Sequence, residues 1–411
     1  MAGESWKSRT LDDCATFGSG GTPFKGRADF WIGTIPWVSA KDLKVFRLHD
    51  SEDHVTAEAV DAGSRLAPAG SIFLLVRGMT LHNDVPICVA MRDMAFNQDI
   101  KALMPKAGVD GAFLTYWLLA QKPALLSSVD SAGHGTGRLN TDTLKAMAVS
   151  LPPLAEQKAI AAVLGALDDK IELNRRMNAT LEAMARALFQ SWFVDFDPVR
   201  AKLDGRPPAA LDPATAALFP ASFDETELGH IPHGWEVKTL GEVIELAYGK
   251  PLKAEDRKNG PVCVYGANGP VGWHDEKLVS GPGIVVGRKG NPGVVTWAHG
   301  DFYPIDTTFY VEPIGSCRSL YFFYYALSLH NLANLSADSA VPGLNRNHAY
   351  MSKQVIPSQP VLTAFDSQIA PIFASIHANE EQSRSLGTVR DTLLPKLLSG
   401  ELTVPLIPSA E

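Results

Sequence analysis

At 411 residues the chain is long enough for two domains, and its hydrophobic content of 45% and charged content of 20% are ordinary for a soluble globular protein. No run approaches the roughly 18 apolar residues of a membrane span, and the first residues lack the apolar core of a signal peptide, so no membrane role is expected. Four widely spaced cysteines without a CxxC pair argue against a zinc site or a disulfide framework, and they fit a reducing cytoplasm.

Residues 1–150 are predicted to fold as the first of two mixed α/β modules. Apolar runs predict strands at residues 35–39 and 71–76, and an aromatic run predicts a helix at 113–120, with Trp37 and the helix aromatics in the core. Two glycine-rich runs, residues 18–21 and 133–137, are interpreted as turns that need positive φ. Leu151-Pro152-Pro153 should end a strand directly before a helix.

Residues 151–194 form a first spacer that is predicted to be one long helix. Its seam positions recur at alternating intervals of four and three residues, as in a coiled coil. They include Ile160, Leu164, Ile171, Asn174, Asn178, Leu181 and Leu188. A helix of about 35–40 residues would be roughly 50–60 Å long. Residues 195–229, which are rich in Pro, Ala and Asp, are interpreted as a connector.

Residues 230–357 are predicted to form the second module, with strands at 284–286 and 309–311 and an aromatic helix at 320–327. The second spacer, residues 358–402, repeats the coiled-coil rhythm, and a short tail follows at 403–411. Its seam includes Ile369, Ile376, Asn379, Ser383, Leu386 and Leu393. Pro395 and Gly400 are expected to end this helix.

The two halves of the chain repeat each other with two different shifts. A shift of 205 residues places Leu139 and Asn140 on Leu344 and Asn345, and it also aligns the two spacers. A shift of 229 residues aligns the module starts at Trp6 and Trp235. The period is too long for a solenoid and indicates a duplicated unit. The modules differ in length, so they are expected to bind different targets.

The two spacer helices are predicted to pack against each other in antiparallel orientation. With their centres aligned, Asn174 meets Ser383 and Asn178 meets Asn379, which forms a polar layer that fixes the register. Leu164 then meets Leu393, Ile160 meets Leu397, and Trp192 meets Phe365. Leu167 faces Arg390, whose charged group is expected to reach water. The alternative is that each helix packs separately on its own module.

The net charge of −8 is concentrated in the spacers. Residues 1–150 carry a net charge of −1 and residues 230–356 a net charge of 0, whereas residues 151–229 carry −4 and residues 357–411 carry −3. Near-neutral modules can bind nucleic acid only through a local basic face. The overall acidity therefore does not exclude DNA binding.

No catalytic or metal-binding constellation is apparent in the sequence. The glycine-rich runs match neither a dinucleotide fingerprint nor a phosphate-binding loop, and there is no Gly-x-Ser-x-Gly elbow. The pair Asp168-Asp169 is interpreted as a solvated helix face, and the eleven histidines show no ligand spacing. The chain is therefore expected to be non-catalytic by itself and to carry no metal.

Several stretches resemble the specificity subunits of type I restriction-modification systems. FGSGGTP with FWIGTIPWVSAKDL is similar to the start of a target recognition domain, and GTGRLN before LPPLAEQKAIAAVL to the passage into the central helical region. DDKIELNRRMNATLEAMARALFQSWFVDFDPVRAK resembles that region itself. ELGHIPHGWEVKTLGEV resembles the restart of the second target domain, and LLPKLLSGEL the end of the distal helix. The second module departs from the pattern, because Tyr248-Gly249-Lys250-Pro251 replaces the SGGTP string.

The resemblance implies an α/β (α+β) fold with two globular target recognition domains, joined by two long helices in an antiparallel coiled coil with a pseudo-twofold internal repeat. It implies that each domain reads one half of a bipartite, double-stranded DNA site. Two adenine-methylating modification subunits would dock on the helices, and ATP-driven restriction subunits would join the assembly. S-adenosylmethionine, ATP and Mg²⁺ are expected on those partners, with no cofactor on this chain. The alternative is a non-catalytic protein-interaction scaffold of two modules on a coiled-coil strut.

Candidate DNA contacts are polar or basic residues in turns beside the predicted strands, because Arg and Lys can pair with guanine and Asn with adenine. The same residue types also bind phosphates without reading sequence. The candidates are Thr22, Lys25, Lys41, Arg77, His134 and Arg138 in the first module, and Lys250, Arg288, Lys289, Asn291, Asn345 and Arg346 in the second. Asn140 and Asn345 match in both halves just before a probable strand, which favours a structural role in capping the backbone over base reading.

Overall fold

The protein is described from a computed structural model that covers residues 6–132, 135–335 and 343–405. It divides into two compact units: residues 1–172 with 383–411 form the first unit, and residues 173–382 form the second. Two 40-residue helices, α6 (Leu154–Phe193) and α12 (Gln359–Leu398), each contribute one part to each unit. Within the described ranges, no helix is both long and apolar enough to cross a membrane.

The first unit is built around a five-stranded sheet in the order β2-β11-β7-β9-β4, which packs against α3 and the unit's parts of both long helices. A four-stranded sheet, β5-β3-β10-β6, and a three-stranded sheet, β12-β13-β8, complete it together with the pair β1-β14. Its strands are β1 Lys7–Thr10, β2 Ala15–Ser19, β3 Ile35–Val38, β4 Arg47–Leu48, β5 Asp53–Val55, β6 Leu66–Ala67, β7 Ile72–Leu75, β8 Arg77–Gly78, β9 Ile87–Ala90, β10 Met94–Phe96, β11 Ile100–Pro105, β12 Asp130–Ala132, β13 Thr136–Arg138 and β14 Ala148–Leu151. Its short helices are α1 Leu11–Cys14, α2 Ala57–Gly63, α3 Gly111–Ala120, α4 Lys122–Ser127 and α5 Thr141–Lys145.

The second unit is built around a four-stranded sheet in the order β18-β24-β21-β22, whose core includes α10 and this unit's parts of the long helices. A three-stranded sheet, β20-β19-β23, and the pairs β15-β16 and β17-β25 complete it. Its strands are β15 Phe223–Thr226, β16 Gly229–Pro232, β17 Glu236–Thr239, β18 Ile244–Tyr248, β19 Val262–Gly266, β20 Gly269–His274, β21 Gly283–Gly287, β22 Val295–Ala298, β23 Phe302–Pro304, β24 Thr308–Pro313 and β25 Lys353–Ile356. Its short helices are α7 Asp197–Leu203, α8 Pro213–Ala217, α9 Leu240–Val243, α10 Leu320–Leu329 and α11 Arg346–Tyr350.

The internal repeat predicted from the sequence is confirmed by the order of elements. In each unit a strand is followed by a four-residue helix that opens with a capping box, formed by Thr10 and Asp13 in α1 and by Thr239 and Glu242 in α9. An apolar helix, α3 or α10, later packs under the central sheet. A side-chain cap then begins α5 at Asn140 and α11 at Asn345, which confirms the capping role expected for both asparagines.

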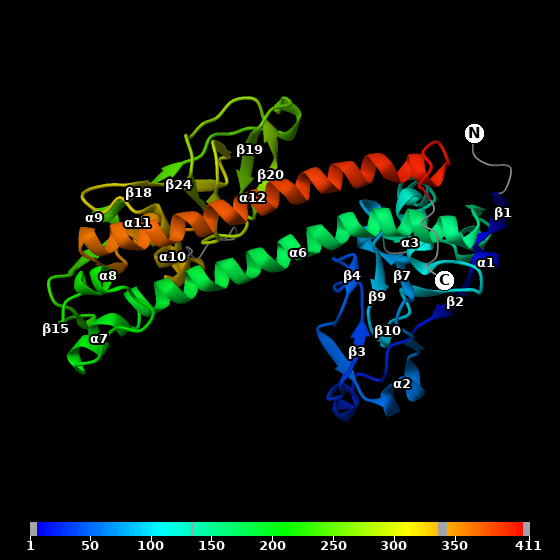
Figure 1. Ribbon diagram of the computed structural model, residues 1–411, viewed down its shortest axis with the longest axis horizontal. Coiled ribbons are helices and arrows are strands. Elements are labelled where there is room, and N and C mark those ends of the chain that lie inside the picture. Colours follow the sequence, from blue (N-terminus) through cyan, green and yellow to red (C-terminus); the bar gives the residue numbers. More distant parts are fainter. Residues whose placement is uncertain (1–5, 133–134, 336–342, 406–411) are drawn as a thin grey trace. The chain divides into compact units, whose positions relative to one another are not determined.

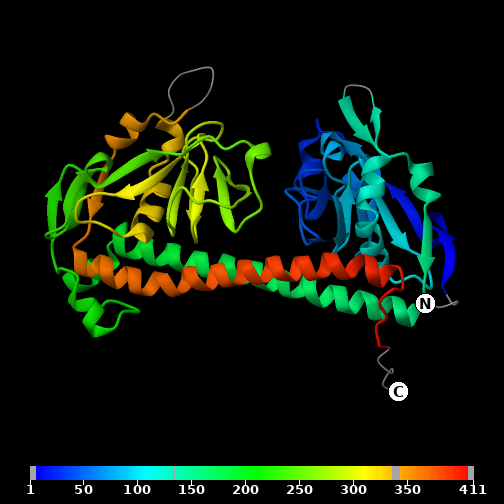
Figure 2. The same ribbon diagram turned by 90° about the horizontal axis from the view of Figure 1, so that it is seen from above.

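The long helices pair in antiparallel orientation inside each unit, as predicted, and Figures 1 and 2 show them running side by side in opposite directions. In the first unit, Ile160 and Leu164 of α6 are buried in one core with Leu397 of α12, and Leu393 packs against that core. In the second unit, the rings of Trp192 and Phe365 lie 6.0 Å apart. The start of α6 therefore meets the end of α12, and its end meets the start of α12.

A polar layer crosses the helix pair in the second unit. The Asn379 side-chain amide donates to Asn178 Oδ1 at 2.8 Å, which confirms the predicted contact. Asn174 is fully buried and donates to Gln382 Oε1 at 2.9 Å and to the Asn379 carbonyl at 3.3 Å. Buried amides of this kind bond well in one alignment only, so they fix the register at some cost in stability.

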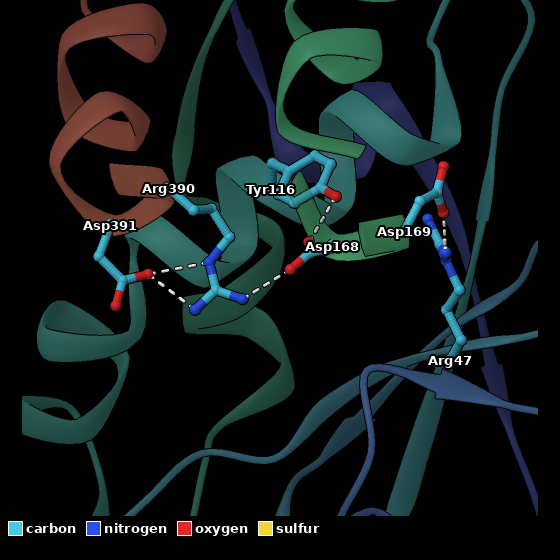
Figure 3. Close-up of polar contacts among 6 residues, drawn as sticks. All are labelled: Arg47, Tyr116, Asp168, Asp169, Arg390 and Asp391. Atoms are coloured by element: carbon cyan, nitrogen blue, oxygen red, sulfur yellow. Dashed lines mark hydrogen bonds and ion pairs between the residues drawn. The ribbon is translucent and has the colours of Figure 1, made fainter. Parts of the chain in front are cut away.

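The interpretation of Asp168-Asp169 as a solvated face is wrong for Asp168, which is only 6% exposed. Figure 3 shows its carboxylate between the Tyr116 hydroxyl, which donates to it at 2.6 Å, and Arg390 Nη1 at 2.7 Å. Arg390 also pairs with the exposed Asp391 at 2.8 Å, and its side chain is 27% exposed, so its guanidinium joins a buried and an exposed carboxylate. Asp169 does lie on the exposed face, where it pairs with Arg47.

Three further expectations, about a glycine-rich turn, the end of the second long helix and the connector, are corrected. None of Gly18, Gly20 and Gly21 has positive φ; a Cβ on Gly20 would lie 2.1 Å from the Phe96 carbonyl, so close backbone approach requires glycine there. Pro395 lies inside the last turn of α12, and the helix ends before Gly400, which does have positive φ. The connector also carries defined elements and buries Phe219 against Trp192, with ring centroids 5.0 Å apart.

Candidate nucleic-acid interface

Both units place basic residues at an equivalent corner of the central sheet. The corner lies where β7 or β21 ends and the segment before α5 or α11 returns. In the first unit the Leu139 amide donates to the Val76 carbonyl, and in the second the Leu344 amide donates to the Arg288 carbonyl, both at 2.9 Å. Because Leu139 and Leu344 are related by the 205-residue shift, Val76 corresponds to Arg288. The next residues are both basic and exposed: Arg77 and Lys289.

The corner of the first unit brings two predicted residues together. Arg77 in β8 lies directly opposite Arg138 in β13, and Asp130 of β12 is the next cross-strand neighbour of Arg138. Directly opposed side chains in an antiparallel pair have Cβ atoms about 4.5–5.5 Å apart, where like charges repel. Both arginines are exposed, and repulsion between them is relieved when an anion binds. Two adjacent guanidinium groups suit phosphate or a guanine edge.

The corner of the second unit gathers two predicted arginines around an exposed tyrosine. The guanidinium carbons of Arg288 and Arg346 lie 4.9 Å and 5.0 Å from the centroid of the Tyr248 ring. Each arginine is anchored by a backbone carbonyl: Arg288 donates to Asp306 at 2.9 Å and Arg346 to Leu246 at 3.3 Å. Tyr248 remains 50% exposed, so the corner combines a half-exposed aromatic ring with two anchored positive charges.

The two corners differ at one cross-strand pair. Ser19 lies opposite Lys101 in the first unit, and Tyr248 lies opposite Phe309 at the equivalent position in the second. Burial and the positive charges of Lys145 and Arg65 lower the pKa of Lys101. The first unit therefore has an ammonium group at this strand pair, whereas the second has two aromatic rings beside its guanidinium groups.

Other predicted contact residues are engaged within the protein. Lys41 forms ion pairs with Glu52 at 3.0 Å and Asp53 at 2.9 Å, which raise the pKa of its ammonium. Thr22 donates to Gln98 at 2.7 Å, and the Asn291 amide donates to Asn268. Asn345 caps α11 through the amides of two following residues.

The structure shows few contacts for the remaining predicted contact residues. Lys25 and Lys250 are exposed on loops, and the Lys250 backbone amide donates to the Pro304 carbonyl at 3.1 Å. His134 lies outside the described residues. The structure thus brings together Arg77 with Arg138, and Arg288 with Lys289 and Arg346.

Four residues near these strand pairs were not predicted as DNA contacts from the sequence: Tyr248, Lys101, Lys145 and Arg65. The sequence did contain a signal for Tyr248, because Tyr248 directly precedes Gly249. Gly249 is the counterpart of Gly20, and the close backbone approach at this glycine places the preceding side chain at the end of the strand. Lys101 had none, since its basic neighbours come from an α-helix and a loop that are distant in the sequence.

Comparison with known proteins identifies the family. The family described as type I restriction modification DNA specificity domain matches residues 3–183 and 232–380, which is more than half of the chain. The chain belongs to this family. The two matched segments cover both halves of the repeat, so each half carries one specificity domain.

Relatives and solved structures agree with this assignment. The chain is 27% identical over 429 residues to the specificity subunit of the type I restriction enzyme MjaIX of Methanocaldococcus jannaschii, covering 98% of this chain and 94% of the relative. It is 28% identical to the HindI specificity subunit of Haemophilus influenzae, over 64% of this chain and 71% of that protein. The S subunit of a type I restriction-modification system from M. genitalium shares the fold, with a TM-score of 0.57, 19% identity and coverage of 95% of this chain and 96% of that one.

Proposed function

We propose that this specificity protein binds an asymmetric, bipartite double-stranded DNA site, and that each target domain reads one half-site through its basic corner. The observation that carries the proposal is the equivalent placement of exposed cations in the two units, at Arg77 and Lys289, on a duplicated fold. The half-sites differ because the corners differ: the first presents Lys101 where the second presents an aromatic pair. Arg and Lys at a sheet corner serve both phosphate positioning and guanine readout.

The chain carries out no chemistry in this proposal. Two modification subunits dock on the paired helices and methylate adenine with S-adenosylmethionine, and restriction subunits supply ATP- and Mg²⁺-dependent translocation. The proposal is supported by the specificity subunits to which the chain is similar.

The decisive experiment is methylome sequencing of cells that carry this chain together with its modification subunit. The expected result is a single methylated motif with two unlike half-sites and a fixed gap. Two identical half-sites would contradict the asymmetric proposal, and an absence of new methylation in cells that assemble the complex would contradict the DNA-reading role.

Arginine variants assign each half-site to a unit. Arg138→Ala should weaken binding to one half-site about 5- to 150-fold, and Arg346→Ala should do so for the other, as expected for loss of a base contact of about 1–3 kcal/mol. Competition between DNA duplexes with one randomised half-site measures this. Arg206→Ala is the matched control, because Arg206 is exposed and pairs only with nearby Asp204 in the described structure.

A salt titration separates this proposal from the protein-interaction scaffold. Affinity for DNA should fall steeply as salt rises while the preference for the methylated motif persists, because phosphate contacts release counterions and base contacts do not. Binding that shows no sequence preference at any salt concentration would favour the scaffold.

The long helices are proposed to set the gap between the half-sites. Inserting seven residues after Glu172 and after Gln382 preserves the seam and lengthens each helix by about 10.5 Å. The methylated gap should then grow by about three base pairs, since base pairs are about 3.4 Å apart, and the half-sites should stay the same. An unchanged gap would show that the helices are not the spacer.

A further inference from the structure

Three potential metal ligands meet in the second unit, outside the candidate nucleic-acid interface. His299 follows β22 by one residue, and His377 and Glu380 lie on α12. One donor atom from each residue can be chosen so that all three lie within 4.8 Å of one another. His299 Nε2 is 3.5 Å from Glu380 Oε2, and the two imidazole rings lie face to face with centroids 4.8 Å apart.

The periodicities of a strand and a helix bring these side chains together. Trp297 and His299 are two residues apart and face the same side of the edge strand β22. Phe373, His377 and Glu380 recur at intervals of four and three residues, so they share one face of α12. Trp297 and Phe373 pack with ring centroids 4.8 Å apart and hold the two elements together. The histidine pair continues this contact toward solvent.

The chemistry of the group suits a borderline transition-metal ion. Two imidazoles and one carboxylate form a donor set that zinc uses in proteins, with a fourth position left for water. The side chain of His299 is 16% exposed and that of Glu380 is 49% exposed, so an ion can enter from the Glu380 side.

We propose that His299, His377 and Glu380 form a binding site for a divalent transition-metal ion such as Zn²⁺, which fastens α12 to the edge strand β22 of the second unit. Ligand atoms in a tetrahedral zinc site lie roughly 3.4 Å apart, given bonds of about 2.1 Å. His299 Nε2 and Glu380 Oε2 are already 3.5 Å apart, whereas donors that lie up to 4.8 Å apart must close by up to about 1.4 Å. The imidazole rings must also turn out of their parallel stack so that both lone pairs face the ion. Rotation of the half-buried His377 and the exposed Glu380 side chains, which lie near the middle of α12, provides this movement. The spacing of the histidines alone does not reveal this site, because its helical signal is a mixed pair, His377-x-x-Glu380.

The test uses the full chain after treatment with a chelator. Titration with Zn²⁺ by calorimetry should show one equivalent bound, and Co²⁺ should give the visible absorption of a site with nitrogen and oxygen ligands. His377→Gln and Glu380→Gln should each weaken Zn²⁺ binding at least about tenfold, since even outer-shell changes cost 10- to 100-fold. His233→Gln is the control, because that histidine pairs with Asp224 and belongs to no group of three potential metal ligands among the described residues.

A second readout does not depend on calorimetry. Zn²⁺ should raise the melting temperature of the wild-type chain and of the control, and it should have less effect on both ligand variants. Circular dichroism in the absence of metal checks that the variants fold. Failure of the wild type to bind Zn²⁺ at millimolar concentration, or unchanged binding by folded ligand variants, would show that the histidines only stack. Neither outcome depends on DNA binding.

Discussion

The two units make the same contact between an apolar helix and the long helices, but they use opposite chemistry. In the first unit Tyr116 of α3 bonds to buried Asp168, which pairs with Arg390. The helix caps Asp110 and Ser319 align Tyr116 with Tyr325 of α10, and the 205-residue shift places Asp168 on Phe373 and Ala185 on Arg390. The second unit thus has Tyr325 beside Phe373, with ring centroids 6.2 Å apart, and buried Ala185.

The difference shows that the repeat conserves geometry without conserving the interaction. An ion pair that a tyrosine completes has one good alignment, because both charges must be satisfied at once. Aromatic packing is less demanding in direction and needs no desolvated charge. The second unit places its directional contacts elsewhere, in the asparagine layer of Asn174, Asn178 and Asn379. Each unit therefore fixes the helix register with its own buried polar group.

Among the variants that test this comparison, Arg390→Ala should cause the largest loss of stability. It leaves the carboxylate of Asp168 buried with only the Tyr116 hydroxyl, and breaking a buried pair costs about 3–5 kcal/mol. The cost should be lower than for a fully buried pair, because the Arg390 side chain is 27% exposed. Hydrogen exchange should accelerate in α3 of the first unit and not in α10 of the second. Arg186→Ala, which removes an arginine 70% exposed in an ion pair with Glu182, should change little.

The double variant Asp168→Phe with Arg390→Ala sharpens the same prediction, because it installs the residue pair of the second unit in the first. Removing both charges together avoids an unpaired buried carboxylate, so at least half of the loss caused by Arg390→Ala should be recovered. The recovery is measured as the stability of the first unit, which is monitored by hydrogen exchange. A double variant less stable than Arg390→Ala would show that the two contacts do not share a geometry.

Removing the two tyrosine hydroxyls should have unequal and smaller effects. Tyr116→Phe removes a hydrogen bond to a charged group, which is worth about 1.5–3 kcal/mol. Tyr325→Phe should be neutral or stabilising by up to about 1 kcal/mol, because its buried hydroxyl has no hydrogen-bond partner among the described residues. Thermal unfolding of the two variants side by side checks this. Equal losses would contradict the proposed difference between the contacts.

The regular elements were predictable because their signals are local. The alternation of four and three residues predicted both long helices, and the predicted strands at 35–39, 71–76, 284–286 and 309–311 match β3, β7, β21 and β24. The antiparallel pairing was predicted by aligning the centres of the two helices, which places Asn178 opposite Asn379 as observed. These inferences need only periodicity and the cost of burying an unpaired amide.

The sites were harder to predict, because they depend on residues that are distant along the chain. Asp168 looked solvated because neither Tyr116, 52 residues away, nor Arg390, 222 residues away, is recognisable as its partner from spacing. Arg77 and Arg138 were named separately, but only the strand register places them opposite each other. In the same way, Arg288 and Arg346 were predicted from the sequence, but the Tyr248 ring that both of them contact was not.

The smallest predicted effect concerns the half-buried carboxyl group of the second unit, Asp366 on α12. Its hydrogen-bond partner is the Ser319 hydroxyl, and the nearby groups Tyr321 and Cys317 are neutral below pH 8. Among the described residues no cation pairs with it as Arg390 pairs with Asp168. Burial raises the pKa of Asp366, although the Ser319 hydrogen bond opposes this. The folded state therefore holds this proton more tightly than the unfolded state, and stability falls as pH rises from the ordinary aspartate pKa of 3.8 through the raised value. Asp366→Asn should remove that slope from the melting of the second unit while the first unit keeps its own pH profile. A slope that persists in the variant would mean that another group in the second unit titrates there.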